Sequence, residues 1–111
     1  MESISVLIPF KANIEFECNK IIKLFNKASK KNNKIIVKLS AVEGAIVVAM
    51  DIALSLQTNI NDTNIDNSIS NSKLNIHIEH VETSYNEMES NVTGNSDLRA
   101  KIEISLINKS I

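Results

Sequence analysis

One stretch of the sequence, KLSAVEGAIVVAMDIALSL at residues 38–56, most constrains what this chain can fold into. Ser40 and Glu43 stand three residues apart, a spacing that predicts a capping box at the start of a helix. Asp51 is the only charged residue between positions 44 and 56. Because a helix that is apolar on nearly every side must be covered on nearly every side, we expect one face to lie on a sheet and the other against a second helix or another subunit.

The residues before this stretch predict a strand, a helix and a second strand. Alternating apolar residues over 3–8 predict a strand that ends at Pro9. Asn13 is a suitable N-cap for a helix that begins at Ile14, and residues 34–39, rich in Ile and Val, predict the second strand. The apolar residues of this first helix recur at helical spacing and predict one buried face: Ile14, Cys18, Ile21, Ile22, Phe25 and Ala28.

Two further strands complete the prediction. Alternating apolar residues predict a strand from Leu74 to about Tyr85, in which the side chains change the face they point to near His80. Residues 86–97 are predicted as a polar loop and residues 100–106 as the last strand. The order β-α-β-α-β-β predicts an α+β fold, a two-layer sandwich of a mixed four-stranded sheet with both helices on one face. The opposite face of the last two strands is predicted to be solvent-exposed because it carries polar residues: Asn75, His77, Glu79, Lys101, Glu103 and Ser105.

Size and composition favour one intracellular domain. The 111 residues, 43% of them hydrophobic, suit a single domain over 1–111, interrupted by a flexible Asn-rich insertion at about 57–73. The single cysteine excludes an internal disulfide, which fits a reducing compartment. The first residues resemble no secretory signal, and no apolar stretch approaches the length that spans a bilayer. We therefore expect a nuclear or cytoplasmic protein without a membrane partner.

The net charge of −1 conceals an asymmetry along the chain. Residues 1–38 carry eight lysines and three glutamates, a balance of +5, whereas residues 39–111 carry four basic and ten acidic residues, a balance of −6. The first third is therefore the candidate surface for an anionic partner. The aromatic content of 4% argues against a base-stacking surface.

Other chemistry finds little support in the sequence. His77 and His80 would point to opposite faces of a regular strand, so they could share a metal ion only across a bulge. Cys18 falls on the apolar face of the first helix, where a buried structural thiol is expected. With only two glycines, the chain has no Gly-rich phosphate loop. We therefore expect no enzyme, no metal site, no cofactor and no small-molecule substrate.

Three segments together resemble the Alba family. They are VLIPFKANIEFE at 6–17, VKLSAVEGAIVVAMDIA at 37–53 and LRAKIEISL at 98–106, so the resemblance spans nearly the whole chain apart from the Asn-rich insertion. The LSA at 39–41 and AKIEISL at 100–106 are most similar to the eukaryotic branch, which is related to protein subunits of RNase P and RNase MRP.

The resemblance implies a function as well as the two-layer fold. Alba proteins are dimers that bind DNA or RNA without strong sequence preference, and the eukaryotic likeness favours RNA. The partner would be a second copy of this chain or another Alba-like protein. In the family, the second helix and the C-terminal strands meet the other subunit, which gives the apolar helix its cover. The interface residues predicted on this basis are Ala45, Val48, Ala49, Ile52 and Leu56.

The sequence departs from the family at its basic positions. Family members carry a basic pair in the loop after the first strand, where this chain has Phe10 and Lys11. They carry Gly-Arg before the second helix, where this chain has Glu43-Gly44, and a basic arm where residues 86–97 are acidic. Because affinity for phosphates scales with the number of cationic contacts, these losses are expected to weaken binding by orders of magnitude at physiological salt.

The cations that remain define the candidate nucleic-acid-binding set: Lys11, Lys20, Lys23, Lys27, Lys30, Lys31 and Arg99. The lysines from 20 to 31 form a stripe on one side of the first helix, and such a stripe is also typical of a solvated helix face. Two functions stay open. One is an Alba-type nucleic-acid-binding dimer, and the other is a dimeric scaffold or assembly subunit, RNase P/MRP-like or chromatin-associated, that has lost most direct contact with nucleic acid.

Overall fold

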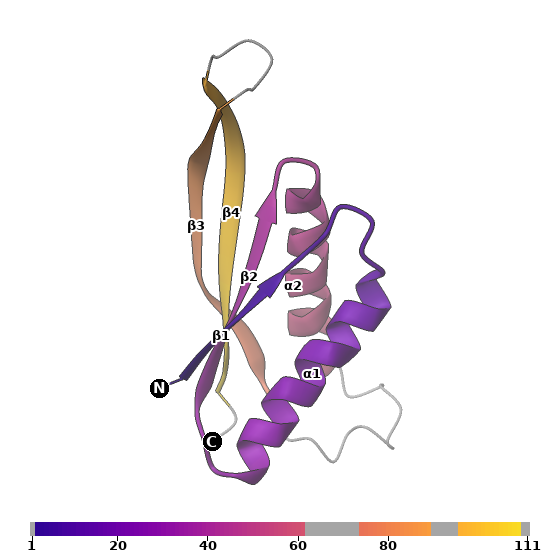
Figure 1. Cartoon of the computed structure of the whole chain (residues 1–111). Helices are drawn as coiled ribbons and strands as arrows, with labels where there is room; N and C mark the ends of the chain where they lie inside the picture. Colours follow the sequence, from indigo (N-terminus) through magenta and orange to yellow (C-terminus); the bar gives the residue numbers. More distant parts are fainter. Residues whose placement is uncertain (1, 62–73, 90–95, 110–111) are drawn as a thin grey trace.

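The computed structural model describes residues 2–61, 74–89 and 96–109 of the chain. Its elements follow the predicted order: β1 (Glu2–Leu7), α1 (Ile14–Lys30), β2 (Ile35–Val42), α2 (Ala45–Asn61), β3 (Ile76–Glu89) and β4 (Ser96–Asn108). The four strands form one mixed sheet in the order β1-β2-β4-β3, with β1 parallel to β2 and the other pairs antiparallel. Figure 1 shows both helices on one side of this sheet, which confirms the predicted α+β sandwich.

Helix α1 begins where the sequence predicts. The Asn13 side-chain oxygen accepts a hydrogen bond from the Phe16 backbone N–H at 2.9 Å, the geometry of an N-cap. Glu15 lies in the first turn and Lys27 and Lys30 in the last, which suits the helix dipole. Ile21, Phe25 and Ala28 are buried as expected, but Ile14 is exposed.

The predicted capping box at Ser40 and Glu43 is wrong. Strand β2 continues to Val42, and Ser40 pairs with Leu7 on one side and Glu103 on the other. Alternation of buried and half-buried side chains through Ala41 favours the strand, because each buried side chain faces the core beneath the helices. Helix α2 then starts at Ala45, after a turn in which Glu43 adopts a left-handed conformation with φ of 52°.

The β3–β4 hairpin is longer than the sequence predicted. Residues 86–89 and 96–97, expected in a polar loop, belong to the two strands, whereas 90–95 lie outside the described residues. Figure 1 shows the hairpin extending past the end of β2 as a two-stranded arm. The predicted change of facing near His80 is confirmed by a register shift between Ile78 and His80.

The Asn-rich insertion begins later than predicted. Residues 57–61 are the last residues of α2, and 62–73 lie outside the described residues. Within this helical end, the Gln57 side-chain oxygen accepts a hydrogen bond from the Ile78 backbone N–H at 3.1 Å. This bond ties α2 to β3, so the second helix lies beside the outer strand of the hairpin.

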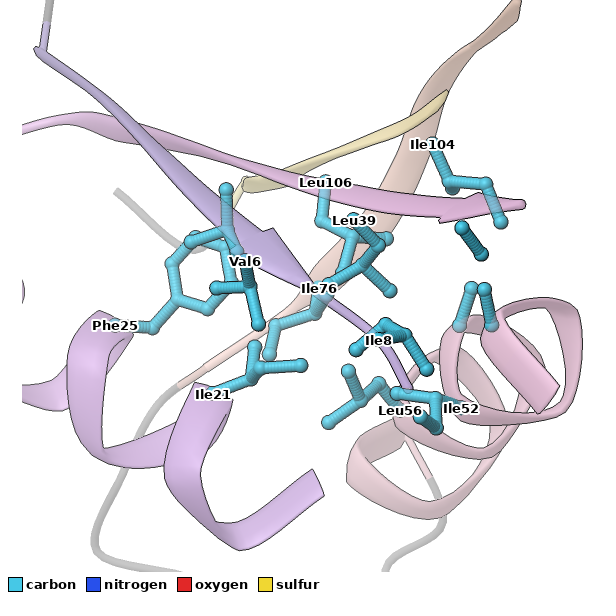
Figure 2. Packing of buried hydrophobic residues seen from close by; sticks show 14 of the residues in the cluster. Val6, Ile8, Ile21, Phe25, Leu39, Ile52, Leu56, Ile76, Ile104 and Leu106 are labelled. Carbon is cyan, nitrogen blue, oxygen red and sulfur yellow. The ribbon is translucent and has the colours of Figure 1, made fainter. Parts of the chain in front are cut away.

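The core lies between the sheet and the two helices. Figure 2 shows side chains from all these layers meeting, with Phe25 of α1 and Leu56 of α2 directed toward Leu39 and Leu106 of the sheet. These four side chains are fully buried. In the described part of the chain, no helix combines the length and the apolar character needed to cross a bilayer.

Candidate nucleic-acid interface

The predicted cations of α1 form one exposed line. Lys20, Lys23, Lys27 and Lys30 recur at intervals of three and four residues, so they share one side of the helix, and all four are exposed. That side is opposite the buried residues of α1. Lys31, just past the helix, is also exposed. The line from Lys20 to Lys30 is about 15 Å long, at a rise of about 1.5 Å per residue.

The seven predicted residues are not clustered at one point. Strands β1 and β2 are parallel, so Lys11 lies at the end of the sheet where both strands finish, together with Glu43 and Arg99. Lys30 and Lys31 lie near the opposite end, where β2 begins. Helix α1 runs between the two ends (Figure 1). The candidate surface is therefore a track along α1, which starts near the base of the arm.

Lys20 differs from the other lysines because it already has an acidic partner. Its Nζ lies 3.4 Å from Oε2 of Glu17, a side chain that is only 9% exposed. That oxygen accepts no hydrogen bond within the described residues, so the lysine is the charge that compensates a buried carboxylate. Lys23 and Lys27 are in none of the described ion pairs. Nothing in the sequence indicated that Glu17 would be buried.

Arg99 is likewise engaged. Its Nη1 lies 3.5 Å from Oε1 of Glu43, and both side chains are about half exposed. The backbone holds the acid in place, because the Glu43 N–H donates to the Ala100 carbonyl at 2.9 Å and its carbonyl accepts from Ile46 at 2.9 Å. The Glu43 carboxylate is thus paired with Arg99, the only arginine among the described residues, at the base of the arm.

An aromatic side chain covers the same turn. The Phe10 ring lies on Gly44 so closely that a Cβ built at that glycine would come within 2.6 Å of the ring. Gly44 therefore permits this contact, while the rest of the ring faces solvent at 66% exposure of the residue. Lys11 is the next residue and is also exposed. Phe10, Lys11, Glu43 and Arg99 are thereby gathered around the start of α2.

The structure places the predicted subunit-interface residues largely inside the chain's own core. Ala45, Ala49, Ile52 and Leu56 are buried in the chain's own core, and Val48 is half-buried against it. A partner cannot reach the four buried side chains. Their burial follows from the contacts of α2 with α1 and with three strands of the sheet, which together cover one whole side of the helix.

A different stripe of α2 faces outward. Val47, Met50 and Leu54 are 63%, 44% and 52% exposed, and they are joined by Asp51. The sequence carried a signal for this stripe, because Val47 and Leu54 lie four residues before and three residues after the only charged residue of the helix. Hydrophobicity alone did not distinguish this side from the buried one.

Strand β3 adds exposed apolar groups to the same side of the sheet. Val81 and Tyr85 pair with Ile104 and Ala100 of β4, and residues directly opposite in an antiparallel pair point to the same face. Because Ile104 is buried beneath the helices, Val81 and Tyr85 also point to the helical side, where both are exposed. Helix α2 and strand β3 contact one another, and we call their exposed apolar residues the α2–β3 apolar surface: Val47, Met50, Leu54, Val81 and Tyr85.

The fold does not arrange the two histidines or Cys18 as a metal site or a reactive-thiol site. The bulge puts His77 opposite Ile107 and His80 opposite Ser105, so both histidines point to the open face of the sheet, contrary to the prediction for a regular strand. Among the described residues, no group of three or more His, Cys, Asp and Glu side chains is arranged to hold a metal ion. Burial, and then the nearby charge of Glu17, raise the pKa of the Cys18 thiol, which disfavours a reactive thiolate.

Comparison with known proteins supports the fold. The chain matches no family model and no curated protein. Among solved structures, it is similar to Alba from Thermoplasma volcanium, with 19% sequence identity and a TM-score of 0.60 over 93% of this chain and 98% of that chain. At this identity the likeness establishes an Alba-like fold and no more.

Proposed function

We propose that this chain is a nucleic-acid-binding protein of Alba type that acts as a dimer and binds without strong sequence preference. The observation that carries the proposal is the exposure of Lys11 and of the lysines along α1 on an Alba-like fold. We favour RNA as the ligand because of the resemblance of residues 39–41 and 100–106 to the eukaryotic branch.

The mechanism is electrostatic. Lysines attract phosphates and release counterions, and they give no information about base identity, so binding is expected to be salt-sensitive and sequence-tolerant. Lys23, Lys27 and Lys30 would supply the principal contacts because each is exposed and in none of the described ion pairs. Lys20 would contribute less, since contact with a phosphate competes with its compensation of Glu17.

We propose a second copy of the chain as the cover of the α2–β3 apolar surface. Its three apolar side chains on the helix, and Val81 and Tyr85 on the strand that contacts it, are exposed in the single chain, and exposed apolar groups of this kind suit a contact with another protein. An isologous contact through this surface would hide it in both copies and leave the lysines of both α1 helices exposed. Another Alba-like protein is the alternative partner.

One observation favours the second function, a dimeric scaffold with little nucleic-acid contact. Glu43 and Glu17 each engage a cation, so two of the seven predicted basic sites are partly neutralised within the chain. In a scaffold, no ligand would compete for the cation of either pair. In a nucleic-acid-binding protein, the exposed Arg99–Glu43 pair would open when a phosphate replaces the carboxylate.

Replacement of Glu43 distinguishes the two functions. Glu43→Gln removes the competing carboxylate and frees Arg99, so we expect about fivefold tighter binding to a labelled 20-nucleotide RNA, in keeping with the modest energy of an exposed ion pair. Fluorescence anisotropy at fixed salt measures the change. The conservative amide keeps the length of the side chain and the backbone bonds of the turn.

Glu103→Gln is the matched control. It produces the same change in net charge, but Glu103 pairs with Lys38 at 3.9 Å on the open face of the sheet, away from α1. We expect its effect on affinity to stay below about twofold. Equal effects of the two variants would show that only total charge matters, and absence of binding by the wild type to RNA and DNA would leave the scaffold function.

A further inference from the structure

Most of the few aromatic side chains in this chain are exposed to solvent. The chain has three phenylalanines and one tyrosine, and only Phe25 is buried. Phe10 and Phe16 are 66% and 63% exposed, although burial of an aromatic ring normally contributes strongly to a core. The low aromatic content by itself argues against base stacking, but it does not show where the few rings lie.

Both exposed phenylalanines lie at the head of the lysine track. Phe16 precedes Lys20, Lys23 and Lys27 by four, seven and eleven residues, so it lies on their side of α1. Amphipathic packing predicts polar residues at such a position, directly away from the buried face. Phe10 lies just before the helix and beside Lys11. Each ring is thereby accompanied by an exposed lysine.

The Phe10 ring is also held in place. It rests on Gly44, where no Cβ intervenes, and the turn at Glu43 is fixed by backbone hydrogen bonds to Ala100 and Ile46. A ring supported on one side and open to solvent on the other loses little conformational freedom when a base stacks on it.

We infer that Phe10 and Phe16 are base-stacking positions, and that the preferred ligand is therefore a single-stranded nucleic acid. Unpaired bases expose flat surfaces that stack on aromatic rings while neighbouring phosphates contact lysines, a combination that is tolerant of sequence. In a duplex the bases are already stacked, so these rings would gain nothing from it. This inference rests on the proposed function and specifies the class of its ligand.

An abasic oligonucleotide isolates stacking from charge. We would measure binding of the full-length chain to three labelled probes by fluorescence anisotropy at one salt concentration: dT12, an abasic 12-mer with the same phosphates, and a 12-bp duplex. We expect the wild type to bind dT12 about tenfold or more tightly than the abasic strand. The Phe10→Leu/Phe16→Leu variant should lose that advantage and keep its affinity for the abasic strand.

Two controls keep the test decisive. Both rings are exposed, so the leucine variant should retain the wild-type thermal unfolding temperature, and Phe10→Tyr/Phe16→Tyr should retain preference for dT12 because its rings still stack. Equal affinity of the wild type for dT12 and the abasic strand would overturn the inference and leave the proposed function intact. Failure of the wild type to bind the three DNA probes would overturn the inference, and failure to bind the 20-nucleotide RNA as well would overturn the proposed function.

Discussion

A variant with Met50→Glu and Leu54→Glu is expected to sediment as a monomer at concentrations where the wild type is expected to be a dimer. Both side chains belong to the α2–β3 apolar surface and face solvent in the single chain, so the substitutions should leave the fold intact. In an isologous interface each substitution occurs twice, which brings four carboxylates together in a desolvated contact. We expect the dimer dissociation constant to rise about 100-fold or more, measured by sedimentation equilibrium.

The control adds the same charge on the other side of the sheet. Ser3 and Ser5 are exposed on β1, opposite Ile36 and Lys38 of β2 and pointing away from the helices. Ser3→Glu/Ser5→Glu should therefore leave the dimer unchanged. A wild type that remains monomeric at tens of micromolar, or a Met50/Leu54 variant that remains dimeric, would contradict the proposed interface.

The second large effect concerns the lysine track. Lys23→Glu/Lys27→Glu removes two contacts and introduces two repulsive charges, so we expect RNA affinity to fall about 100-fold at ~0.1 M salt. Both side chains are exposed and outside the described ion pairs, so stability should change little. Anisotropy titrations with the same RNA used for the Glu43 variant measure the loss.

A variant of equal charge on the open face tests whether position matters. Lys38 and Lys101 lie on β2 and β4, on the face of the sheet that the helices do not cover. Lys38→Glu/Lys101→Glu changes the net charge by the same amount and should weaken binding by less than about threefold. If both double variants lost affinity equally, the track along α1 would not be the binding surface.

Local patterns predicted most of the fold. Asn13 was recognisable as a cap, period-two alternation located the strands, and the change of facing near His80 anticipated the bulge in β3. These features depend on neighbouring residues and on rules of backbone geometry, so they can be inferred without knowledge of tertiary contacts.

The errors arose where tertiary contacts decide between two local signals. Ser40 and Glu43 satisfy the spacing of a capping box, but pairing of Ser40 with two neighbouring strands extends β2 through that site. The acidic end of the hairpin reads as a loop because its residues are polar, whereas pairing between β3 and β4 needs no buried face there.

The candidate site was predicted less completely than the fold. Exposure of Lys23 and Lys27 follows from helical periodicity, but the engagement of Arg99 by Glu43 joins residues 56 positions apart in the sequence. The outward stripe of α2 was hidden because the helix is apolar on both sides, and only Asp51 marks the exposed one. The close contact of the Phe10 ring with Gly44 joins residues 34 positions apart in the sequence.

The salt dependence of RNA binding by the wild-type chain tests the central claim most directly, because it counts the phosphate contacts made by lysines. Apparent association constants would be measured for a single-stranded 20-nucleotide RNA between about 50 and 300 mM salt. With four or five available cations per chain, we predict a log–log slope of about −3 or steeper. A slope near zero, or no measurable binding at the lowest salt concentration, would contradict the account.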